Sequence, residues 1–111
     1  MSDVSEEFDA EVVWQRSEAV VVVNGELDLA TSPRLAACID EVADHHAGDV
    51  VVDLAGVSFL DSSALRVLVA AHLRLADGDR RLVVRQPSDA TRSVLTVAGL
   101  LTTLAIETPG H

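Results

Sequence analysis

The sequence contains no lysine and no tyrosine, and its aromatic side chains come from only two phenylalanines and one tryptophan. The 18 acidic residues outnumber the 8 basic ones, all arginine, and the formal net charge is -10. Nucleic acid and anionic membrane surfaces repel a strongly acidic chain, and few aromatic rings are present for bases to stack on. The composition therefore predicts no direct binding to nucleic acid or to a membrane, and it favours a basic protein surface as the partner.

The sequence also has a single cysteine, Cys38, so no disulfide can form within the chain and an oxidising compartment is not indicated. The first eleven residues, MSDVSEEFDAE, lack both the basic and the apolar segment of a signal peptide. No apolar run approaches the ~20 residues that a membrane-spanning helix needs. These absences predict a cytoplasmic protein, and no motif indicates a cofactor.

Apolar residues make up 49% of the sequence and are mostly valine, leucine and alanine. This is enough for one aliphatic core and argues against disorder. A length of 111 residues suits one domain. We expect a flexible N-terminal tail at residues 1–7, the domain at residues 8–107 and a short C-terminal tail at residues 108–111.

Short apolar runs rich in valine predict five strands, at residues 8–14, 19–23, 50–54, 82–84 and 104–106. Apolar residues at helical spacing predict three helices, from residues 31 to 48, 62 to 76 and 88 to 99. Residues 16–18 are predicted to form a turn within an antiparallel hairpin, and residues 55–60 to form a loop. The order β-β-α-β-α-β-α-β predicts an α/β fold with a mixed, mostly parallel β-sheet and helices packed against it.

The two longer helices each have an apolar stripe that is expected to face the sheet. The stripe of the first helix consists of Leu35, Ile39, Val42, Ala43 and His46. The stripe of the second consists of Leu65, Leu68, Val69, His72, Leu73 and Ala76. Thr31 or Ser32 is expected to cap the first helix, because both residue types are preferred at that position.

The sequence lacks the common motifs of hydrolases, metalloproteases and nucleotide-binding enzymes. His45 and His46 are adjacent and project from a helix in different directions, so they make a poor metal pair. His72 lies on an apolar stripe, where a partly buried structural histidine is expected. Cys38 is most simply a small hydrophobic residue. We therefore predict no catalytic residue and no metal site.

Two polar patches follow predicted strands. Gly25-Glu26-Leu27-Asp28 precedes the first helix, and the segment 58–65 opens the second. Functional loops of open α/β sheets gather outside the strand ends, so the two patches could form one surface. Within the second patch, Asp61-Ser62-Ser63 has two interpretations. It is either a helix cap alone, or it also contains a phosphoacceptor serine whose phosphate faces the free N–H groups of the helix N-terminus.

Together these residues resemble the STAS domain, in particular the bacterial anti-anti-sigma factors, also called anti-sigma factor antagonists. The resemblance rests on Gly25-Glu26-Leu27-Asp28, on Thr31, and on Asp53-Leu54 followed by the block from Val57 to Leu65. It covers nearly the whole chain. The D-S-S block is fairly specific when the G-E-L-D block precedes it, whereas either block alone is weak.

The resemblance implies a STAS fold and a protein that binds an anti-sigma factor that is also a serine kinase. The unphosphorylated form captures this kinase and frees the sigma factor for transcription. The kinase phosphorylates the second serine of the D-S-S block, Ser63, with Ser62 as the alternative acceptor. A PP2C-type phosphatase restores the active form. The implied partner-binding residues are Glu26, Asp28, Thr31, Asp61, Ser62, Ser63 and Ala64.

Ala64 stands where the family usually has glycine, and its Cβ either crowds the kinase or favours the helix start. Two alternatives remain open. The chain could be a STAS binding module without phosphorylation, such as a regulatory subunit of a transport system. It could also be an enzyme with Ser62 or Ser63 as nucleophile, which needs a base, and His72 lies roughly 13 Å along the same helix. A monomer and a weak dimer are both compatible with the sequence.

Overall fold

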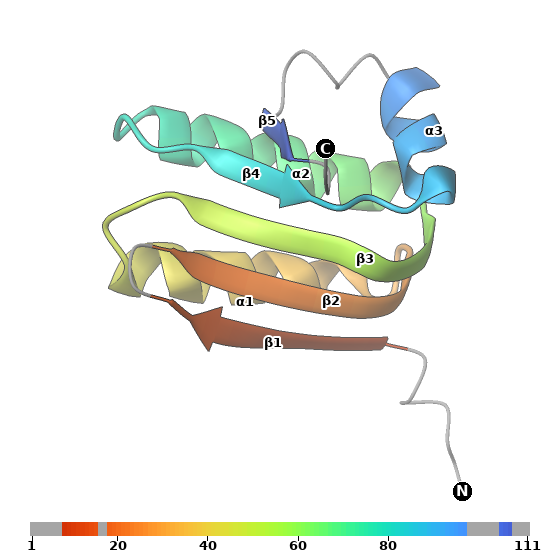
Figure 1. Cartoon of the computed structure of the whole chain (residues 1–111), viewed down its shortest axis with the longest axis horizontal. Helices are drawn as coiled ribbons and strands as arrows, with labels where there is room; N and C mark the ends of the chain where they lie inside the picture. The colour runs from red at the N-terminus through yellow and green to blue at the C-terminus, as the bar shows by residue number, and fades with distance from the viewer. Residues whose placement is uncertain (1–7, 16–17, 98–104, 108–111) are drawn as a thin grey trace, which may run out of the picture.

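The structure is a computed structural model that describes residues 8–15, 18–97 and 105–107, and its elements follow the predicted order (Figure 1). In chain order they are β1 (Phe8–Trp14), β2 (Ala19–Leu27), α1 (Ser32–His45), β3 (Val50–Leu60), α2 (Ser62–Ala76), β4 (Leu82–Arg85), α3 (Asp89–Val97) and β5 (Ala105–Glu107). The predicted fold class, α/β with a mixed and mostly parallel sheet, is confirmed.

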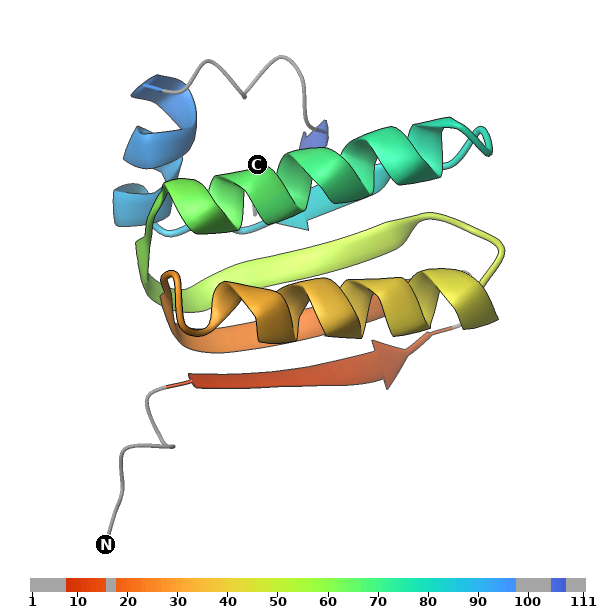
Figure 2. The same ribbon diagram turned by 180° about the vertical axis from the view of Figure 1, so that it is seen from behind.

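The five strands form one sheet in the order β1-β2-β3-β4-β5. β1 and β2 pair antiparallel, as the predicted hairpin requires, and the other neighbours pair parallel. Helices α1 and α2 cover one face of this sheet, behind it in Figure 1 and in front of it in Figure 2. Helix α3 stands beside the carboxyl end of β4 (Figure 1). The parallel strands therefore direct their carboxyl ends, and the N-termini of α1 and α2, to one end of the molecule.

The core between the sheet and the helices is aliphatic, as the composition predicts. Helix α1 buries the four apolar residues of its predicted stripe, whereas His46 lies just beyond the end of the helix. The stripe predicted for α2 is wrong in phase, because the helix buries Ala64, Leu68, Ala71 and Leu75 and leaves Leu73 62% exposed. Apolar residues surround most of α2, so their spacing alone does not define which side faces the sheet.

The loop predicted at residues 55–60 is also wrong, because β3 continues as a strand to Leu60. Its pairing with β2 shifts register twice, between Val22 and Asn24 and between Gly25 and Glu26. At each shift β3 contains one residue more than β2, which is the pattern of a β-bulge. The buried positions of β3 then fall every third residue in this stretch rather than every second, which disguises the strand in the sequence.

Some predictions concern parts of the chain outside the described residues: the turn at residues 16–17, the helix end at residues 98–99, the strand start at residue 104, and the two tails. Among the helices that the structure describes, none is both long enough and apolar enough to cross a membrane.

Candidate functional site

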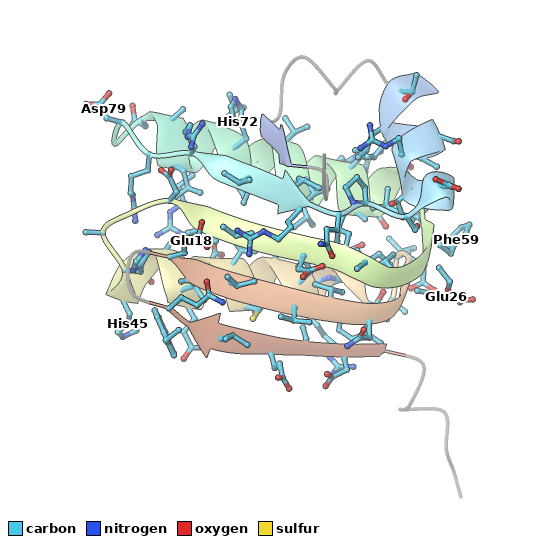
Figure 3. The ribbon with its side chains drawn as sticks, in the orientation of Figure 1. Glu18, Glu26, His45, Phe59, His72 and Asp79 are labelled. Carbon is cyan, nitrogen blue, oxygen red and sulfur yellow. The ribbon has the colours of Figure 1, made fainter. Side chains whose placement is uncertain are left out.

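The carboxyl ends of β2 and β3 lie level with each other, and each leads into a helix. Leu27 pairs with Leu60, and Glu26 pairs with Phe59. The Asp61 N–H donates a hydrogen bond to the Leu27 carbonyl oxygen at 3.1 Å. Glu26 and Phe59 accordingly appear at the same end of the molecule in Figure 3. The two polar patches of the sequence therefore lie side by side, as expected.

Asp28 organises the turn between β2 and α1. Its Oδ1 atom accepts hydrogen bonds from the N–H groups of Ala30 and Thr31, both at 3.0 Å. The Thr31 hydroxyl accepts a bond from the Asp28 N–H at 2.9 Å and donates to the Glu26 carbonyl oxygen at 2.8 Å. Thr31 is the N-cap residue of α1, as one of the two predicted alternatives, but no capping bond from its side chain forms. Thr31 has φ and ψ of -99° and -21°, not the extended backbone from which a capping side chain reaches forward.

Asp61 begins α2 as its N-cap residue, with extended backbone angles. Its Oδ1 atom accepts hydrogen bonds from the Ser63 N–H at 2.9 Å and from the Ala64 N–H at 3.3 Å. The same oxygen accepts the Ser63 hydroxyl at 2.5 Å. One carboxylate therefore both caps the helix and holds the side chain of the serine that the resemblance identifies as phosphoacceptor.

Ser32 of α1 connects this serine to the neighbouring turn. Its Oγ atom lies 3.1 Å from Ser63 Oγ and 2.7 Å from the Asp28 carbonyl oxygen. Each hydroxyl has one hydrogen to donate, so the two serines cannot satisfy at once the contacts to Asp28, to each other and to Asp61. The bond to the ionised carboxylate of Asp61 is the strongest of the three. Ser63 therefore donates to Asp61, and Ser32 donates either to the Asp28 carbonyl or to Ser63.

The charge at this end of the molecule is negative. The pKa of the Asp61 carboxyl lies below its usual value, first because the Ser63 hydroxyl donates to it and further because backbone N–H groups do so. Such a carboxylate is a weak base. The exposed Glu26 and the half-buried Asp28 lie in the same surface. The N-termini of α1 and α2 contribute partial positive charge, which stabilises the capping carboxylates.

Two exposed apolar side chains flank the serines. Leu29, in the turn after β2, is 78% exposed, and Phe59, near the end of β3, is 48% exposed. Exposed apolar side chains of this size beside polar groups are typical of protein interaction sites. Neither Leu29 nor the Ser32–Ser63 contact was predicted from the sequence as part of the site. The position of Leu29, an apolar residue within a polar turn, could have indicated an exposed interaction residue. The Ser32–Ser63 contact joins residues 31 positions apart and depends on the fold, so no local pattern indicates it.

The remaining predicted site residues differ in accessibility. Ser62 is exposed, and Thr31, Asp61 and Ser63 are half-buried. Ala64 has no exposed surface and packs in the hydrophobic core. Its methyl group therefore faces the core rather than the surface.

Residues that could support other chemistry lie elsewhere. His45 is at the opposite end of the molecule from Phe59 (Figure 3). Within the ranges that the structure describes, no group of His, Cys, Asp and Glu side chains could hold a metal ion. His72 is half-buried, as expected. Cys38 packs against the core, and burial raises the pKa of its thiol, with a further contribution from Glu41. A protonated thiol of this kind behaves as a small hydrophobic residue.

The sequence matches the model of a protein family described as "Mlab, STAS domain" over residues 10–106. It is 31% identical over 80 residues to the anti-sigma-B factor antagonist of Staphylococcus aureus, covering 72% of this chain and 74% of that protein. It is 34% identical over 82 residues to the anti-sigma-F factor antagonist RsfB of Mycobacterium tuberculosis, covering 74% of this chain and 66% of that one.

The fold is also similar to that of a solved protein. The crystal structure of an anti-sigma factor antagonist from Mycobacterium paratuberculosis matches with a TM-score of 0.82 and 30% sequence identity. The match covers 96% of this chain and 90% of the other. The similarity therefore extends over nearly the whole fold.

Proposed function

Because the chain belongs to the STAS domain family, we propose that it is an anti-sigma factor antagonist that acts by binding rather than by catalysis. In this proposal the partner is an anti-sigma factor with serine kinase activity, which the unphosphorylated chain captures. Phosphorylation of Ser63 releases the kinase, and a PP2C-type phosphatase reverses the modification. We also propose that the chain acts in the cytoplasm, where it regulates transcription through these partners.

The observation that carries the proposal is the position of the Ser63 hydroxyl. It lies at the N-terminus of α2, where its Oγ atom contacts Asp61 and Ser32, and the exposed Leu29 and Phe59 belong to the segments that lead into α1 and α2. A kinase bound over these two apolar side chains covers the hydroxyl that it modifies. The acidic residues around them favour a partner with a basic rim.

The contacts of Ser63 also explain how a phosphate changes the surface. The phosphate ester has no hydroxyl hydrogen, so the bond from Ser63 Oγ to Asp61 is lost. A group with a charge of about -1.5 to -2 then stands beside the Asp61 carboxylate. Repulsion turns the phosphate away from Asp61 and toward the partner. A partner that accepts Leu29 and Phe59 must then desolvate this charge, and its affinity falls.

Intact-mass measurement on the protein purified from its native cells, with fragmentation to locate the phosphate, tests the proposal. We expect a phosphorylated fraction modified at Ser63 that disappears after treatment with a PP2C-type phosphatase. A phosphate on Ser62 alone would move the acceptor by one residue. The absence of any phosphate under growth and stress conditions would contradict the switch.

A second candidate is a STAS binding module that is not phosphorylated, such as a regulatory subunit of a transport system. The half-burial of Ser63 and its bond to Asp61 favour it, because both features hold the serine within the first turn of α2 without any modification. Pull-down from native cells separates the candidates. A sigma-pathway kinase supports the first, and a transporter subunit supports the second.

The enzyme hypothesis receives little support from the geometry. The carboxylate that accepts the Ser63 hydroxyl belongs to Asp61. Its lowered pKa makes it a poor general base. Hydrolysis of generic esters that is lost in Ser63→Ala would restore this hypothesis.

A further inference from the structure

Strand β1 is the edge of the sheet formed by the described residues, and it is far from the serines along the chain. It pairs with β2 on one side only. Alternate N–H and C=O groups of an edge strand point outward and can pair with another extended chain. The strand has seven residues, Phe8–Trp14, which is long enough to hold a short added strand.

A groove runs beside this edge, between β1 and α1. It has a volume of about 530 Å³ and is lined by Val12 and Trp14 of β1 and by Glu41, Val42 and His45 of α1. Trp14 is 56% exposed, which is unusual for the largest apolar side chain of a small domain. Its ring packs edge-on against His46, with the ring centroids 6.1 Å apart. The groove therefore offers an apolar floor and an aromatic wall beside free backbone groups.

The charges on both faces of the edge are negative. Successive side chains of a strand point to opposite faces, so Asp9 and Glu11 lie on the face away from α1, and Glu41 lies on the α1 face. Among the described residues, these three carboxylates take part in no ion pair. Arg34 packs over Phe8 at 4.7 Å, but Phe8 is at the other end of β1, roughly 20 Å from Trp14.

We propose that the β1 edge and this groove form a second docking site, which binds an extended basic segment of a partner protein as a sixth strand. A lysine or arginine of that segment on the α1 face reaches Glu41 with its charged group and packs its aliphatic stem along Trp14. A basic residue on the opposite face lies across from Glu11 or Asp9. The site is independent of Ser63, so its occupancy does not require the proposed phosphorylation.

A second copy of the chain is a poorer occupant of this edge. Antiparallel pairing of two β1 strands centred on Glu11 places the two Glu11 carboxylates opposite each other, and a shift by one residue pair places Glu11 opposite Asp9. Like charges across a strand pair are destabilising. Acidic side chains on an edge strand thus oppose self-association and admit a basic partner.

Trp14 is the only tryptophan in the chain, and its fluorescence reports directly on the groove. The probe is the peptide acetyl-VRKVRV-amide, which carries cations on both faces of a strand, titrated into the full chain at about 0.15 M salt. We expect a saturable change in Trp14 fluorescence and slower hydrogen exchange of the β1 amides. Glu11→Gln and Glu41→Gln should each weaken binding about two- to fivefold, whereas Asp89→Asn, which removes an exposed acid at the start of α3, should leave it unchanged.

A control peptide with the same side chains but every backbone amide N-methylated retains the charge and has no N–H group to donate to β1 from either edge. If this control binds as tightly as the probe, charge attraction without strand pairing accounts for the binding, and the proposal is overturned. No fluorescence change up to about 1 mM probe, or protection at elements other than β1, would overturn it as well. If the β1 amides become protected from hydrogen exchange when the chain concentration is raised without peptide, the edge binds a second copy of the chain instead.

Discussion

Helices α1 and α2 begin side by side, and each is preceded by an aspartate that accepts backbone N–H groups of its turn, but the two carboxylates differ in their hydroxyl partner. Asp28 is associated with Thr31, whose hydroxyl also bonds the Asp28 N–H and the Glu26 carbonyl. Asp61 is associated with Ser63, whose only other hydroxyl contact is Ser32 among the described residues. The first hydroxyl is part of the turn, whereas the second can be modified without removing a backbone contact.

This difference separates a structural turn from a switchable one. A phosphate on Ser63 leaves the N–H groups of Ser63 and Ala64 free to keep their bonds to Asp61, so α2 can retain its start. A modification of Thr31 would instead break bonds that hold the 28–31 turn. The proposed switch therefore acts on the charge of the surface and leaves the fold intact.

The largest expected effect is that of a negative charge at Ser63 on affinity for the kinase. Ser63→Glu should weaken binding at least tenfold, equivalent to about 1.4 kcal/mol, because a carboxylate is added beside Asp61 at the interface. Ser63→Ala should bind like the unmodified chain but resist release by ATP. Isothermal titration calorimetry gives both affinities, and Ser93→Glu, which adds the same charge at an exposed serine of α3, is the control. Equal affinity of Ser63→Glu and wild type would reject the electrostatic mechanism.

Removal of the Asp61 cap should lower the free energy of unfolding by about 1 kcal/mol, within the range of 0.5–2 kcal/mol found for caps. Removal of the Asp28 carboxylate, which holds the turn before α1, should lower it by about 1 kcal/mol as well. If the two turns differ as described, Asp28→Ala should also alter the amide signals of residues 28–31, and Asp61→Ala those at the start of α2. Urea unfolding gives the stabilities, and Ser62→Ala, at an exposed position of the same turn, is the control. An Asp61→Ala variant as stable as wild type would show that its capping bonds contribute little.

Ser32→Ala should have a smaller effect, roughly 0.5 kcal/mol, although the side chain is only 3% exposed. The Asp28 carbonyl keeps the N–H bonds from Thr31 and Ser32, so no acceptor is left unsatisfied. The informative measurement is the rate of Ser63 phosphorylation, because the variant removes the Ser32 hydroxyl, which lies within hydrogen-bond distance of Ser63 Oγ. An unchanged rate would confine Ser32 to a packing role.

The smallest expected effect is the pH dependence contributed by Asp61. Its pKa is lowered in the folded chain, so its contribution to stability is present above the unfolded value of about 3.9 and is lost as the pH falls through the folded value. Wild type should therefore lose more stability than Asp61→Asn below about pH 4. Urea unfolding of both proteins between neutral and acidic pH provides the comparison, and parallel curves would argue against the contribution.

Much of the fold was predictable because it depends on local signals. The valine runs, the aspartate and serine residues before α2, and the helical spacing of α1 are each readable within ten residues or so of sequence. The phase of α2 was not, because apolar residues surround the helix, and neither was the second half of β3, whose bulges hide the strand period. Both depend on contacts with elements far away in the chain.

The candidate site divides in the same way. Asp61 and Ser63 were predictable, since a capping motif lies within three residues. Ser32 was expected to cap α1 and instead faces Ser63, and Ala64 was expected at the partner surface and instead is buried. Which side chains of two neighbouring turns meet is decided by the pairing of β2 with β3, which no local pattern records.

The two bulges of β3 make the number of residues in this strand matter as much as their identity. Deletion of one residue between positions 55 and 59 would remove one bulge and advance the start of α2 by one position relative to Leu27. Since each residue turns an α-helix by about 100°, either the helix would rotate and carry Ser63 away from Ser32, or it would unwind at its first turn. Substitutions at the exposed positions of β3 preserve this count, except that a Cβ at Gly56 would collide with the Asn24 side chain. We therefore expect the other exposed positions to tolerate changes of residue far better than the segment tolerates changes of length, and measurements of stability and Ser63 phosphorylation on single-residue deletions test this.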